Sequence, residues 1–165
     1  MAYDPKTIVT VNKTITLTGN GATTISIFSL TGIVRVHEIY GVVTEATNAT
    51  TLQKVGLILY EATPTTVEIT DTGTGVDCSA TVVGSLFIRT AVVGATSPLT
   101  HNKANVCSTM EIQYDGSGYG LVLVQRAGVT TNVKASFTGD ANLDCDVCWY
   151  AKYTPLSAGA SLTAV

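Results

Sequence analysis

The residues of this chain best suited to chemistry are two cysteines separated by two positions, Cys145 and Cys148. A pair with this spacing binds zinc on a tight turn or performs redox chemistry at the start of a helix. Here the pair lies among aromatic and β-branched residues, which predicts a strand that sends the two side chains to opposite faces. Cys78 and Cys107 follow no short zinc motif. Structural zinc, one or two disulfides and free thiols stay open, and free thiols are favoured.

Alternating oxygen-bearing side chains near this strand imitate the beginning of a calcium loop. They are Asp140, Asn142, Asp144 and Asp146. A calcium loop needs a glycine at its sixth position and a bidentate glutamate at its twelfth, whereas this chain has Cys145 and Ala151 there. An ordinary solvated turn is therefore the favoured interpretation, and we predict neither a metal site nor a cofactor.

The two histidines, His37 and His101, are the remaining candidates for catalysis. Neither stands in a recognisable nucleophile or metal motif, and no phosphate-binding loop or hydrolase signature is present. His37 has Arg35 and Glu38 as near neighbours, so a polar network within a sheet or an interface is favoured over catalysis. We therefore predict no catalytic residue and no small-molecule substrate, and we expect that the protein is not an enzyme.

The strand that positions the cysteine pair covers residues 144–156 and holds the only tryptophan, Trp149. Alternation predicts that Trp149 and Tyr153 share the core face, while Tyr150 shares the opposite face with Cys148. Aromatic side chains of this size dominate cores and interfaces. We expect Trp149, Tyr150 and Tyr153 to hold either the core or a seam between the subunits of a trimer.

Short strand-like segments, separated by glycine, asparagine and proline turns, make up the rest of the chain. In one of them Ile25 and Ile27 are predicted to point inward, and in the longest one Gly41 predicts a bulge or a bend. No helical periodicity and no internal repeat is present. The pattern predicts an all-β protein whose fold is a jelly-roll-like antiparallel β-sandwich with a single domain.

The predicted boundaries divide the chain into three parts. Residues 1–12 form an N-terminal arm or edge strand, residues 13–156 the β-sandwich domain, and residues 157–165 a C-terminal tail of small residues.

The composition is poor in charge. Charged residues make up 13% of the chain and hydrophobic residues 45%, and the mean hydropathy is +0.34. The surface of a lone soluble domain normally carries more charge, so we expect further copies of the chain or a larger assembly to cover much of it. The other possibility is that Thr, Ser, Gly and Asn solvate the surface without charge.

The same composition excludes several classes of partner. A net charge of −3 and the lack of a basic run disfavour nucleic-acid binding. The N-terminus lacks a signal-peptide pattern, and no apolar run approaches the roughly 18 residues of a spanning helix. We therefore expect a soluble protein made in a cytosol, with no membrane partner.

Two segments resemble small structural proteins of tailed bacteriophages. They are WYAKYTPLSAGAS at 149–161 and IYGVVT at 39–44. In those proteins the chain ends on an aromatic strand, a Tyr-x-Pro-Leu segment and a small-residue tail. The resemblance is to capsid decoration, or cement, proteins, and it implies jelly-roll subunits that bind the major capsid protein on the outside of the head as a homotrimer. The implied location is the virion, after synthesis in the host cytoplasm.

The two chain ends are the segments that we expect to contact the capsid or sister subunits. The residues are Ala2, Tyr3, Asp4, Ile8, Val9, Val11, Leu162 and Val165. The alternative is a receptor-binding or tail-fibre head that recognises a host-surface glycan through polar loops at 100–105 and 115–119. Glycan binding without affinity for capsids would favour this alternative.

Overall fold

The computed structural model describes residues 7–49, 51–61, 67–70, 78–79, 81–89, 99–102 and 121–165. All regular structure in these residues is β-strand, which confirms the all-β prediction. In chain order the strands are β1 (Val9–Leu17), β2 (Gly21–Thr31), β3 (Ile33–Val43), β4 (Leu52–Glu61), β5 (Val67–Glu68), β6 (Leu86–Arg89), β7 (Leu99–Asn102), β8 (Leu121–Val124), β9 (Thr131–Gly139), β10 (Cys145–Pro155) and β11 (Ser161–Ala164).

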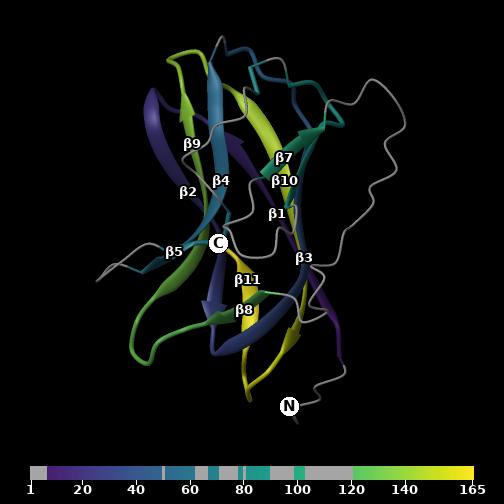
Figure 1. The fold of residues 1–165 in the computed structure, drawn as a ribbon, viewed down its shortest axis with the longest axis vertical. Helices are drawn as coiled ribbons and strands as arrows, with labels where there is room; N and C mark the ends of the chain where they lie inside the picture. Colours follow the sequence, from purple (N-terminus) through teal and green to yellow (C-terminus); the bar gives the residue numbers. More distant parts are fainter. Residues whose placement is uncertain are drawn as a thin grey trace.

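The strands form two antiparallel sheets that pack face to face as a sandwich (Figure 1). Sheet A has the order β1-β10-β3-β6-β7, and β8 pairs with β3 beyond the end of β6. Sheet B has the order β11-β2-β9-β4-β5. The chain crosses between the sheets at each step from β1 to β4 and from β8 to β11, so that β10 lies between β1 and β3 and β9 lies between β2 and β4. The predicted antiparallel β-sandwich is confirmed.

The core lies between the sheets and receives alternate side chains from each long strand. On β9, for example, Val133, Ala135 and Phe137 are buried, while Lys134 and Ser136 between them are partly exposed. The alternation follows from the pleat of a strand, and each apolar side chain removed from water stabilises the fold by roughly 25 cal/mol per Å² of buried area.

Strand β2 departs from simple alternation. Ile25 faces the core side as predicted, but the pairing of β2 with β9 shifts register between Ser26 and Phe28. Ile27 is buried at this bulge, and the inward positions then continue through Phe28 and Leu30. One inserted residue reverses the faces that follow it, so Phe28 enters the core although the period of the sequence places it outside.

Gly41 lies inside an unbroken stretch of pairing between β3 and β10, directly opposite Trp149. The predicted bulge or bend at Gly41 is therefore wrong, and the register shift of this pair lies at His37 instead. A Cβ atom at Gly41 would stand 2.8 Å from Cγ1 of Val147 and 3.1 Å from Cε3 of Trp149. Glycine is required here because the indole ring and its neighbour fill the space.

Candidate assembly surfaces

The structure places Cys145 and Cys148 on opposite faces of β10, and both thiols are free. Cys145 is fully buried in the core. Its burial, followed by the negative charges of Asp146, Asp144 and Glu45, raises the pKa of the Cys145 thiol from 9.0 to about 12. A thiol that keeps its proton is a poor nucleophile and a poor metal ligand, so Cys145 is a packing residue.

Of the other two cysteines, Cys78 is buried and precedes β6 in the sequence, and Cys107 lies outside the described residues.

The oxygen-rich turn between β9 and β10 uses its first carboxylate to hold the fold. Asp140 accepts hydrogen bonds from the backbone N–H of Thr51 (2.7 Å) and of Asn142 (2.9 Å). Further along, the Thr16 hydroxyl donates to the Asp146 carboxylate at 2.5 Å. No group of three His, Cys, Asp or Glu side chains in the described part of the chain is placed to hold a metal ion. These contacts support the interpretation of the segment as a structural turn.

His37 and Glu38 join β3 to β10. The His37 Nε2 atom lies 2.8 Å from the Thr154 hydroxyl, and Glu38 forms an ion pair with Lys152 at 2.8 Å. Arg35 stands apart from this network, because its Nε atom is buried without a hydrogen-bond partner. The side chain of His101 lies outside the described residues. The predicted polar network therefore exists within sheet A, without Arg35.

The three aromatic residues of β10 divide between the two faces. Trp149 and Tyr153 are buried, and the indole ring of Trp149 stacks on Phe87 with 6.0 Å between centroids. Tyr150 lies on the outer face, where its ring stacks on Tyr40 at 5.2 Å. Trp149 and Tyr153 thus hold the sandwich, and Tyr150 is the member of the three whose side chain is available for a seam between subunits.

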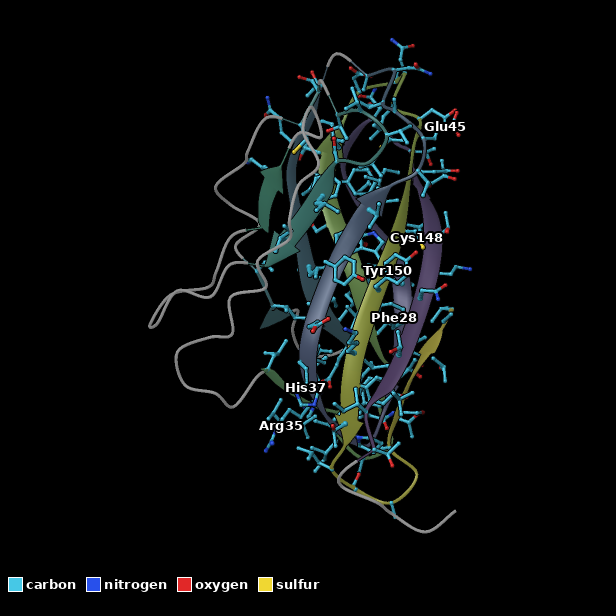
Figure 2. All side chains as sticks on the ribbon, turned by 90° about the vertical axis from the view of Figure 1, so that its right-hand side faces the viewer. Phe28, Arg35, His37, Glu45, Cys148 and Tyr150 are labelled. Carbon is cyan, nitrogen blue, oxygen red and sulfur yellow. The ribbon has the colours of Figure 1, made fainter. Side chains whose placement is uncertain are left out.

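In the described part of the chain, the outer face of sheet A, which Figure 2 shows from the front with Tyr150 near its centre, carries an apolar patch over β3, β6, β8 and β10, beside the polar side chains of β1. We call this surface the sheet A face. Its apolar side chains, assigned from the strand register, are Ile33, Tyr40, Val42, Leu86, Ile88, Val122, Val124, Cys148 and Tyr150. Val122 is 45% exposed and Val124 48%. Within this face a hydrogen bond with the Cys148 side chain, followed by its charge, raises the pKa of the Tyr150 phenol.

The outer face of sheet B has a different chemistry. Its side chains are mostly small and polar, and on β2 and β9 they are Thr24, Ser26, Ser29, Asn132, Lys134, Ser136 and Thr138. Lys134 places its ammonium 3.6 Å from the ring centroid of Tyr60. This face shows the alternation of apolar core positions and polar outer positions that is typical of an antiparallel sheet in water. The sheet A face departs from that pattern.

The predicted contact residues at the two chain ends come together on one side of the sandwich. Val9 and Val11 lie in β1, the edge strand of sheet A, and β11 is the neighbouring edge strand of sheet B. Ile8 is 62% exposed and Val165 54%, whereas Leu162 is buried in the core. Ala2, Tyr3 and Asp4 lie outside the described residues.

The loops of the glycan-binding alternative are only partly described. Residues 100–102 belong to β7 by their backbone, and 103–120 lie outside the described residues.

Comparisons of the chain with protein-family models, with curated proteins and with solved structures find no match. Within the described residues no helix has the length and apolar character needed to cross a membrane.

Proposed function

We propose that this protein is a non-enzymatic structural protein of a phage virion, which binds the major capsid protein on the outside of the head as a homotrimer and stabilises the shell. The observation that carries the proposal is the apolar sheet A face. Exposed apolar patches of this kind mark protein contacts. The outer face of sheet B in the same molecule, by contrast, carries mostly small polar side chains, as expected for a face in contact with water.

The charge distribution of the sheet A face favours another charge-poor surface as its partner. Glu38 and Lys152 neutralise each other across β3 and β10, and the register places one further charge of each sign on this face, Arg35 and Asp146. Interface centres are depleted of charge and enriched in Tyr and other aromatic residues. A second copy of this chain meets that requirement, because only 13% of its residues are charged.

The strand order supports the jelly-roll part of the proposal. Sheet A contains β1, β10, β3 and β8, and sheet B contains β2, β9, β4 and β5. These eight strands match the two four-stranded sheets and interleaved order of a jelly roll. In this scheme β6 and β7 are an insertion beside β3, and β11 is an added edge strand.

The mechanism of such a protein is geometric. A trimer that touches several capsid subunits at once ties them together, because each contact after the first is intramolecular and benefits from a high effective concentration. The groups that sequence patterns offer for catalysis have structural partners instead: Asp140 holds a turn, His37 joins two strands, and Cys145 fills the core.

The test is a mass measurement by light scattering, followed by co-sedimentation with empty capsids assembled from the major capsid protein of the same genome. We expect a mass of three 17.2 kDa chains and binding to capsids. The double variant Val122→Thr/Val124→Thr, on the sheet A face, should shift the mass towards the monomer. The control Thr24→Ala, on the exposed face of sheet B, should not.

A stable monomer that ignores capsids contradicts the proposal. Glycan binding by a protein that has no affinity for capsids would favour the receptor-binding alternative in its place.

A further inference from the structure

Among the described strands, β1 forms one edge of sheet A and has a partner on one side alone. Its nine residues pair with β10 on one side, and no backbone hydrogen bond in the described part of the chain reaches its other side. In Figure 2 β1 is the purple strand that borders the sheet facing the viewer. The unpaired N–H and C=O groups of such an edge accept a further strand.

The features that normally protect an open edge are scarce in β1. Natural edge strands are short, bulged, or interrupted by proline or charge. β1 has neither proline nor glycine, and its pairing with β10 runs without a register shift. The exposed side chains on its outer face are uncharged, namely Thr10, Asn12, Thr14 and Thr16. The one charged residue, Lys13, lies partly buried on the inner face.

The sequence of β1 is complementary to itself when two copies run antiparallel. If the two-fold axis passes through Asn12, Thr10 lies opposite Thr14 of the second copy and Val9 lies opposite Ile15 of the second copy. Thr–Thr pairs then lie on the outer surface and Val–Ile pairs on the inner surface, where Val11 faces Lys13 of the second copy. Cross-strand pairs of both kinds stabilise antiparallel sheets.

Two registers shifted towards the C-terminal end of β1 fit less well. An axis through Lys13 places two ammonium groups directly opposite each other, which destabilises the pair. An axis through Thr14 leaves Ile8, which is 62% exposed, beyond the end of the second copy. The axis through Asn12 places Ile8 opposite Thr16 of the second copy and covers it.

We propose that β1 pairs antiparallel with β1 of a second copy across a two-fold axis at Asn12, which joins two A sheets into one continuous sheet. This contact goes beyond the proposed trimer. A two-fold contact uses the same surface on both subunits, whereas each contact in a ring of three joins two different surfaces. The β1 contact therefore links subunits that belong to different trimers.

The test is disulfide trapping in the full chain. Directly opposite residues have Cβ atoms about 4.5–5.5 Å apart, close to the separation that a disulfide needs. Under mild oxidation Asn12→Cys should give a two-chain species on a non-reducing denaturing gel. The matched control Thr10→Cys is equally exposed, but its two copies would stand about 13 Å apart along the strands and should give no such species beyond the wild-type background.

A mixture of Thr10→Cys and Thr14→Cys chains should cross-link with each other more than either does alone. Failure of Asn12→Cys to cross-link, or equal cross-linking of Asn12→Cys and Thr10→Cys, overturns the proposal.

A second variant tests the pairing itself. Asn12→Lys places two like charges on the axis and should abolish cross-linking between Thr10→Cys and Thr14→Cys chains that carry it. If the wild-type protein is a monomer that ignores capsids but Asn12→Cys still traps pairs, the proposed function fails and the β1 contact stands. If capsid binding persists in every variant and no trapping occurs, only the β1 contact fails.

Discussion

At the scale of single residues, the side chains on the inner face of β10 pack in the core, whereas Tyr150 lies on its outer face. Trp149 is fully buried, and its indole Nε1 has no hydrogen-bond partner. An unpaired buried donor costs about 1–3 kcal/mol, which the stack on Phe87 and the surrounding apolar contacts offset. Tyr150, one position further, stays on the sheet A face. Parity thus decides which side chains of this strand face the core, although Cys148 on the outer face is buried as well.

Cys145 makes the stability of the fold depend on alkaline pH. The pKa of this thiol is about 12 in the folded protein and near the ordinary 9.0 in the unfolded chain. Between these values the unfolded state has lost a proton that the folded state keeps. The stability contributed by Cys145 is therefore complete below about pH 9 and is lost as the pH rises towards 12, by at most about 1.4 kcal/mol per pH unit.

Urea unfolding at several values from about pH 7 to about pH 10.5 measures this effect. In the Cys145→Ala variant the free energy of unfolding should fall less steeply with rising pH than in the wild type. The control Cys148→Ala, which removes the thiol on the outer face and leaves Cys145 in place, should retain the steep fall. If the free energy of unfolding falls equally steeply with pH in the wild type and in Cys145→Ala, the pKa of the Cys145 thiol is not raised in the folded protein.

At the scale of elements, turns and register shifts tie the two sheets together. The turn after β9 belongs to neither sheet, yet its Asp140 carboxylate holds the backbone just before β4 through the N–H of Thr51. The same carboxylate closes the turn through Asn142. One side chain therefore positions the start of a sheet B strand relative to the connection that leads into sheet A.

Replacing Asp140 by alanine should lower the free energy of unfolding by about 2 kcal/mol, because two backbone donors lose a charged acceptor. Asp140→Asn keeps one acceptor oxygen and should cost less. The exposed Asn142 contributes its backbone rather than its side chain to these bonds, so Asn142→Ala should stay within about 0.5 kcal/mol of the wild type. Urea midpoints give these values, and a midpoint that rises on addition of calcium would instead support the calcium-loop interpretation.

At the scale of the whole molecule, the two outer faces of the sandwich differ in chemistry. Sheet B exposes hydroxyl and amide groups, with the Lys134 ammonium on the ring of Tyr60. The sheet A face exposes aliphatic and aromatic groups, and its Glu38–Lys152 pair is internally neutral. An assembly built on the sheet A face is held by apolar burial rather than by charge.

The assembly should therefore resist salt. Raising the ionic strength from about 0.05 M to about 1 M shortens the screening length several-fold, and an association driven by ion pairs would weaken accordingly. We expect the mass of the proposed homotrimer, measured by light scattering, to remain unchanged over this range. Dissociation at high salt would point to an electrostatic interface elsewhere on the surface.

The sequence by itself determined the class of fold and, in a strand such as β10, which side chains face the core. Alternation along β10 separates Trp149 and Tyr153 from Tyr150, because the side-chain period of a strand is two and needs no knowledge of its neighbours. The glycine and proline turns mark most strand boundaries for a similar local reason.

Only the tertiary structure decided which strands are neighbours and what they leave uncovered. The role of Gly41 depends on the ring of Trp149 across the sheet, and the place of Phe28 depends on a register shift against β9. The position of β1 at the end of the sheet A strand order depends on its pairing with β10, which lies more than a hundred residues away in the chain. Such pairings depend on the packing of the whole sandwich, and no local pattern encodes them.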